Sequence, residues 1–139
     1  MTIFLDTSVL LSASASSKGA SREIFRRASR NQWLLVTTHY ATEEVARNLP
    51  DLTPSAAADW ANLRQELVIV ADVLTIDWPT VFPVAKDRPI LFSALAWADV
   101  LLTLDTGDFG GLMEKPFYGL HVAKPGVFLE RERSAGRLV

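Results

Sequence analysis

The chain of 139 residues contains no cysteine. This absence excludes disulfide bonds, thiolate catalysis, iron–sulfur clusters and zinc sites built on cysteine. Histidine is scarce as well, because His39 and His121 are its two copies, which are too few for a histidine-rich metal site. Oxygen ligands remain, and they favour a hard cation such as Mg²⁺ or Mn²⁺.

Long apolar runs are also missing. No stretch approaches the roughly 20 apolar residues that span a bilayer, so we expect no membrane segment. Residues 9–15 have the small and apolar composition of a signal peptide, but no basic leader precedes them and Asp6 interrupts the apolar stretch. We therefore predict a cytoplasmic protein. Serine-hydrolase, dinucleotide-binding and Walker motifs are absent too.

The formal net charge is −2, so no general field draws the chain toward nucleic acid. The basic residues are nevertheless concentrated between positions 18 and 30. Arg22, Arg26 and Arg30 share one stripe of a helix predicted over residues 21–31, and this stripe suits RNA phosphates. A solvated helix face with a Glu23–Arg27 pair explains the same pattern.

Apolar strands alternate with helical segments along the chain, which predicts one α/β domain over residues 1–139 with a largely parallel, helix-covered sheet. The strands are expected over 2–6, 33–38, 68–71, 100–103 and 118–122, and the helices over 8–15, 21–31, 39–49, 53–67, 88–98 and from Pro125. The central strand is expected to end in a polar loop. No element is favoured over 75–84, and the charged end, 131–139, is expected to fray.

Carboxylates recur where these elements meet. Asp6 ends the first strand and Asp105 ends the central one, while Asp87 starts the helix between them and Glu44 lies about one turn into the helix after the second strand. In a parallel sheet these positions share one edge. Crowded carboxylates repel, and the pKa of at least one should rise. Divalent cations relieve the repulsion, and two fit about 3.5–4 Å apart in a phosphoryl-transfer site.

Each acidic residue also has a purely structural explanation. Asp6 can end its strand through a local turn. Asp87 can cap a helix, which stabilises it by about 1 kcal/mol. Glu44, next to Glu43, fits a solvated helix face. Asp105 and Asp108 can simply solubilise a loop. The functional interpretation rests on their shared position in the fold.

Four segments, in this order and spacing, resemble the acidic signatures of the PIN domain family: Phe-Leu-Asp-Thr-Ser at 4–8, Glu-Val-Ala-Arg-Asn-Leu at 44–49, Asp-Arg-Pro-Ile-Leu-Phe-Ser-Ala at 87–94, and Ala-Asp-Val-Leu-Leu-Thr-Leu-Asp-Thr-Gly-Asp-Phe at 98–109. Lys-Pro-Gly-Val-Phe-Leu at 124–129 is similar to the last helix of the toxin-like branch. The resemblance covers nearly the whole chain. It implies a three-layer α/β/α sandwich with a mostly parallel sheet in strand order 3-2-1-4-5.

The resemblance further implies an Mg²⁺- or Mn²⁺-dependent endoribonuclease, often the toxin of a toxin–antitoxin pair. It assigns the catalytic, metal-binding acids to Asp6, Glu44, Asp87 and Asp105, a variable fifth acid to Asp108, and supporting hydroxyls to Ser8 and Thr103. The segment from Thr103 to Asp108 is one residue longer than the commonest form of the motif. Which of Asp105 and Asp108 faces the metal therefore stays open.

Two other functions fit the same residues: an inactive PIN-like module that binds RNA or protein, and a housekeeping RNA-processing nuclease. All four signature positions carry acids, which favours an enzyme. The expected partners are an RNA substrate and an antitoxin, and a homodimer is left open. The antitoxin would pair an arginine with Asp6 and Asp105. It would also lay an apolar helix on Leu10, Leu11 and Phe25, residues that equally fit the core.

Overall fold

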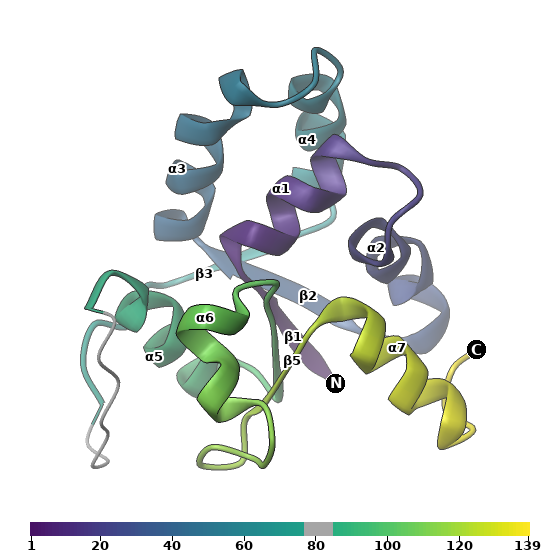
Figure 1. Ribbon diagram of the computed structural model, residues 1–139, viewed down its shortest axis with the longest axis vertical. Helices are drawn as coiled ribbons and strands as arrows, with labels where there is room; N and C mark the ends of the chain where they lie inside the picture. The colour runs from purple at the N-terminus through teal and green to yellow at the C-terminus, as the bar shows by residue number, and fades with distance from the viewer. Residues whose placement is uncertain (77–84) are drawn as a thin grey trace.

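The computed structural model describes residues 1–76 and 85–139. Its centre is a five-stranded, all-parallel sheet in the order β3-β2-β1-β4-β5 (Figure 1). The strands are β1 (Thr2–Leu5), β2 (Leu34–Thr38), β3 (Val68–Val70), β4 (Val100–Leu102) and β5 (His121–Ala123). The predicted α/β fold and strand order are confirmed.

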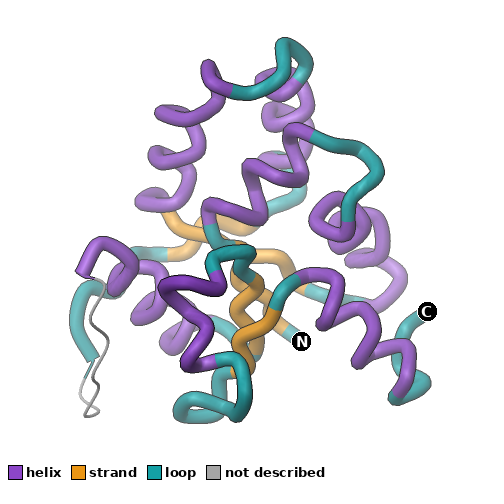
Figure 2. Tube along the Cα trace, viewed as in Figure 1, coloured by secondary structure: helices purple, strands orange, loops and turns teal. Residues whose placement is uncertain are grey.

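Helices flank this sheet and complete the three-layer sandwich (Figure 2). The α-helices are α1 (Thr7–Ala15), α2 (Ala20–Asn31), α3 (His39–Asn48), α4 (Ala56–Arg64), α5 (Arg88–Trp97), α6 (Thr106–Phe109) and α7 (Pro125–Ser134). Short 3₁₀ turns are η1 (Leu49–Asp51), η2 (Ala85–Asp87) and η3 (Gly110–Leu112). Helix α1 packs on α2, α3 and α4, while α5 packs on β1 and β4. No described helix combines the length and apolar character needed to cross a bilayer.

The two central strands form the middle of the core. Ile3, Phe4 and Leu5 of β1 are fully buried, and so are Leu101 and Leu102 of β4. This burial follows from their position, since each strand has a neighbour on both sides and helices over the sheet. The chain leaving β1 therefore emerges at the middle of the sheet edge, where Asp6 lies.

The segment after β4 differs from the predicted polar loop. It forms α6 and η3, because the Asp105 carboxylate accepts the backbone N–H of Asp108 at 2.9 Å and caps the first turn. Phe109, at the end of α6, is fully buried and fixes this turn to the core. The side chains of Asp105 and Asp108 are thus held by one helical turn.

The last strand begins later than predicted. Tyr118 and Gly119 have φ values of 48° and 82°, so both lie in the left-handed region. Phe117 and Leu120 exchange backbone hydrogen bonds of 2.8 and 2.9 Å across this two-residue turn. Residues 118 and 119 of the expected strand 118–122 therefore belong to the turn, and pairing with β4 begins at His121.

Three further predictions concern the ends of elements and the core. The expected fraying of 131–139 is wrong, because α7 continues to Ser134 and Arg137 holds Glu132 by two bonds of 2.8 and 3.0 Å. Leu10 and Phe25 are buried and belong to the core, while Leu11 is half-buried. Of the undecided stretch 75–84, residues 77–84 lie outside the described part of the chain.

Candidate metal centre

Asp6 lies at the end of β1 and begins the site. Its carboxylate is only 5% exposed and accepts hydrogen bonds from the Thr7 N–H, the Ser8 hydroxyl and the Thr103 hydroxyl, at 2.8, 2.8 and 2.7 Å. The first of these bonds caps α1, so the structural explanation of Asp6 holds in part. Burial raises the pKa of Asp6, although the three hydrogen bonds oppose the rise. Ser8 and Thr103 orient this carboxylate.

Glu44 approaches the same place from α3. It is half-buried, and its Oε1 accepts the Thr7 hydroxyl at 3.0 Å. The neighbouring Glu43 is exposed and lies 2.9 Å from the Nε2 of His39. Glu43 therefore lies on the solvated face of α3. Glu44 instead faces the start of α1, next to Asp6.

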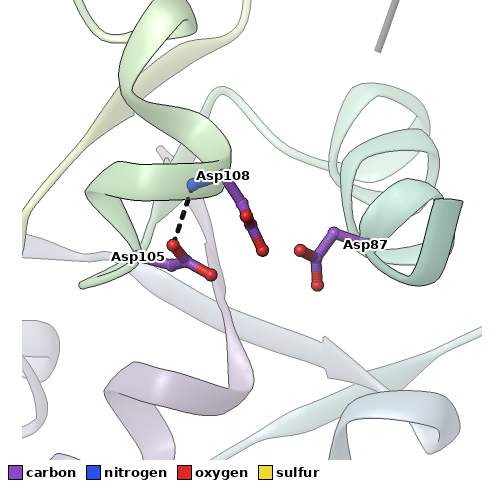
Figure 3. Close-up of side chains that lie close together, drawn as sticks. All are labelled: Asp87, Asp105 and Asp108. Carbon is purple, nitrogen blue, oxygen red and sulfur yellow. Dashed lines mark hydrogen bonds between the residues drawn. The ribbon is translucent and has the colours of Figure 1, made fainter. Parts of the chain in front are cut away.

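Three carboxylates form a tighter group. One oxygen each of Asp87, Asp105 and Asp108 lies within 4.8 Å of the others, which is close enough to hold a metal ion. Asp87 comes from the start of α5 and points toward Asp108, while Asp105 and Asp108 come from α6 (Figure 3). We call these three residues the acidic triad. Asp6 and Glu44 are not members of this group.

Two members of the acidic triad, Asp87 and Asp108, interact directly. A hydrogen bond joins the Asp87 and Asp108 carboxyl groups. Burial, then this bond and the negative charges of Asp6 and Asp108, raise the pKa of Asp87 to about 7. The same hydrogen bond holds the pKa of Asp108 below its usual value. The sequence-based expectation that one crowded carboxylate has a raised pKa is met at Asp87, with burial as the larger cause.

One buried oxygen of the acidic triad has no hydrogen-bond partner in the described part of the chain. Among the described residues, two buried side-chain oxygens have no hydrogen-bond partner, namely Oδ2 of Asp87 and Oγ1 of Thr38. Asp87 occupies the cap position of α5, yet its side chain makes no capping bond, so capping does not account for it. An unpaired buried carboxylate oxygen beside two more carboxylates fits a hard cation as its missing partner.

The arginine stripe lies away from this site. Arg22 donates to the Ala13 carbonyl at 2.7 Å and pairs with Asp59 at 3.0 Å. Ala13 lies seven residues along α1 from Asp6, or about 10 Å at helical rise. Arg26 is bonded to Glu23 and to the Ser17 carbonyl, while Arg30 is exposed. RNA contacts by these arginines stay a prediction.

Two residues at the site were not found by sequence reasoning. The Tyr40 hydroxyl donates to the Lys86 carbonyl at 2.5 Å, and the Lys86 ammonium lies 3.8 Å from Asp108. Burial and the charges of Glu44 and Asp87 raise the pKa of Tyr40. The available signal was its spacing, because Tyr40 precedes Glu44 by one helical turn on α3 and shares its face.

No protein-family model and no curated protein matches this chain. The resemblance to the PIN domain therefore rests on the four acidic segments themselves.

The raised pKa of Asp87 predicts how the metal-free protein responds to pH. Folded Asp87 keeps its proton up to about pH 7, against 3.8 for an unperturbed carboxyl group. The folded state then binds more protons than the unfolded state between these values, so stability should fall as pH rises through this window. The lowered pKa of Asp108 has the opposite effect on stability. That effect is confined to pH values near and below 3.8, the unperturbed pKa of the carboxyl group.

Thermal unfolding in EDTA from about pH 5 to about pH 8 measures this effect. Asp87→Asn should flatten the decline, because an amide can donate to Asp108 at every pH. Asp6, whose pKa is also raised, leaves a residual slope in the variant. An equally steep decline in Asp87→Asn and wild type would contradict the assignment.

Proposed function

We propose that the protein is a divalent-metal-dependent endoribonuclease of the PIN-domain kind, with Mg²⁺ or Mn²⁺ as its cofactor. One observation carries the proposal. Carboxylates from four separate segments meet at the carboxyl edge of the central strands, and one buried oxygen among them, Asp87 Oδ2, has no partner. Helix capping accounts for one oxygen each of Asp6 and Asp105 but not for Asp87, and like charges without a cation destabilise one another.

The acidic triad would hold the cation. When bound, the ion supplies a water molecule of lowered pKa and neutralises charge on the phosphate oxygens. Asp6 keeps a fixed orientation through Ser8 and Thr103 and adds negative charge beside Asp105 and Asp87. Asp87, whose pKa is raised, would have to be deprotonated to serve as a ligand of the cation. In the proposed hydrolysis the attacking group would be water, and the carboxylates of the triad would hold the cation.

We further propose that the nuclease is the toxin of a toxin–antitoxin pair. A nuclease kept beside the RNA of its host needs restraint, and an arginine placed among the triad would supply both charge and hydrogen bonds. The apolar contacts of such a partner lie elsewhere than on Leu10 and Phe25, since both are buried. Slowed growth on expression alone, restored by a co-expressed neighbouring gene, would support this role.

The nuclease proposal is tested by incubating mixed RNA with the protein in Mg²⁺, in Mn²⁺ and in EDTA. We expect internal cleavage with either ion and none in EDTA, because the site offers oxygen ligands to a hard cation. Zn²⁺ should not be required. Intact RNA under all conditions, from protein shown to be folded, would reject the nuclease and favour a binding module.

A further inference from the structure

One cationic side chain reaches the acidic triad. The ammonium of Lys86 lies 3.8 Å from Oδ2 of Asp108, and its side chain is 73% exposed. Its charge also acts on Asp87. Among the described residues, no other ion pair involves a member of the triad. Lys86 is thus an exposed positive charge beside the acidic triad.

The backbone of Lys86 is held in place, whereas its side chain is largely exposed. The Tyr40 hydroxyl holds the Lys86 carbonyl, and the Tyr40 N–H donates to Asp72 at 3.3 Å. The same helix, α3, holds the start of α1 through Glu44 and Thr7. The short turn η2 is therefore anchored to α3, and it delivers Asp87 inward and Lys86 outward from adjacent positions.

The bond between Lys86 and Asp108 is weak and replaceable. A single contact of 3.8 Å at an exposed lysine is typical of surface pairs that add little to stability. A divalent cation at the triad would take the Asp108 carboxylate and leave the ammonium without its partner. An ammonium held about one side-chain length from a phosphodiester-cleaving centre is suited to a phosphate oxygen.

We propose that Lys86 is a substrate-binding residue, which contacts a backbone phosphate of single-stranded RNA next to the cleaved bond and is released for this contact when a cation occupies the triad. This inference rests on the proposed nuclease function. It differs from the arginine stripe predicted from the sequence, because Arg22 and Arg26 are engaged with carbonyl and carboxylate groups of the protein itself.

The test compares Lys86→Ala and Lys86→Arg with Lys115→Ala, a control that removes the same charge from an exposed site. Binding of a fluorescent 12-nucleotide oligouridylate is measured by anisotropy in Ca²⁺ at several KCl concentrations, with gels showing that the oligonucleotide stays intact. Loss of one phosphate contact should reduce the slope of log K against log salt by about 0.7. We expect this loss, with weaker binding, in Lys86→Ala, and wild-type slopes in Lys86→Arg and Lys115→Ala.

A second measurement needs no RNA. Removal of a competing positive charge should tighten Mn²⁺ binding to Lys86→Ala by about threefold, the scale of a surface ion pair, with no change in Lys115→Ala. Electron paramagnetic resonance of free Mn²⁺ reports this affinity. RNA affinity and metal affinity thus move in opposite directions, which a loss of folding cannot produce.

The outcomes separate the two proposals. If wild type binds the oligonucleotide and Lys86→Ala keeps its slope, Lys86 is not a phosphate contact while the nuclease proposal stands. If Lys86→Ala and Lys115→Ala lose the same slope, the effect is one of net charge and the inference is overturned. If wild type neither binds nor cleaves RNA in any cation, both proposals fail.

Discussion

Substituting Asp105 by asparagine is expected to reduce RNA cleavage by about a thousandfold while the protein stays folded. The loss follows from removing one carboxylate of the acidic triad, where charge stabilisation of this kind typically contributes a factor of 10²–10³. Folding should survive, because the amide oxygen of asparagine can still accept the Asp108 N–H that caps α6. Cleavage of a labelled RNA in Mn²⁺, together with a melting curve in EDTA, measures both quantities.

Asp99→Asn is the matched control. Asp99 lies at the opposite, amino edge of the sheet, where its carboxylate accepts the Thr2 N–H at 2.9 Å. The change in charge is identical, and the amide oxygen of asparagine can again accept the backbone N–H. We expect full cleavage activity in this variant. Comparable activity in Asp105→Asn and Asp99→Asn would remove the triad from the mechanism. Asp6 is a less clean position for this test, since its second oxygen accepts two hydroxyl groups.

Phe109→Ala is expected to lower the free energy of unfolding by about 3–5 kcal/mol, the usual cost of truncating a fully buried phenylalanine. The position matters beyond the cavity, because Phe109 ends the four-residue helix that carries Asp105 and Asp108. Urea unfolding gives the stability, and Mn²⁺ affinity at low temperature reports on the triad. We expect both to fall.

Phe117→Ala controls for the size of the side chain. Phe117 is half-buried and packs edge-on against Tyr118, outside the acidic site. Its loss should cost about 1 kcal/mol and leave Mn²⁺ affinity unchanged. Equal losses of stability at the two positions would show that α6 is not held by the core as described.

The order of the strands was predicted through the resemblance to the PIN domain. The meeting of the acids was predictable from the residues themselves, because apolar runs that stop at a carboxylate mark both the strands and their shared edge. Asp6 and Asp105 show this directly. The helix α6 was missed because its four residues contain a glycine and two polar side chains, and its stability comes from the Asp105 cap and from burial of Phe109. Neither contribution appears in a hydrophobic pattern.

The positions of Lys86 and Tyr40 at the site could not be predicted from the sequence for another reason. Their role arises from a contact between residues 46 positions apart, and an isolated lysine or tyrosine has no periodic signature. The choice between Asp105 and Asp108 likewise depended on the turn that α6 makes, which brings both acids into the triad. The types of residue along the chain were enough to predict which edge of the sheet carries the acids. The contacts between their side chains could be determined only from the folded structure.

The hydrogen bond from Thr103 to Asp6 joins positions 97 residues apart. Because β1 is made first and its neighbour β4 much later, a chain emerging from the ribosome has no complete acidic site until most of its length is available. At about 5–20 residues per second, roughly 5–20 s separate synthesis of the two residues. The strand order 3-2-1-4-5 therefore delays the assembly of any activity at this edge until translation of the domain is nearly finished.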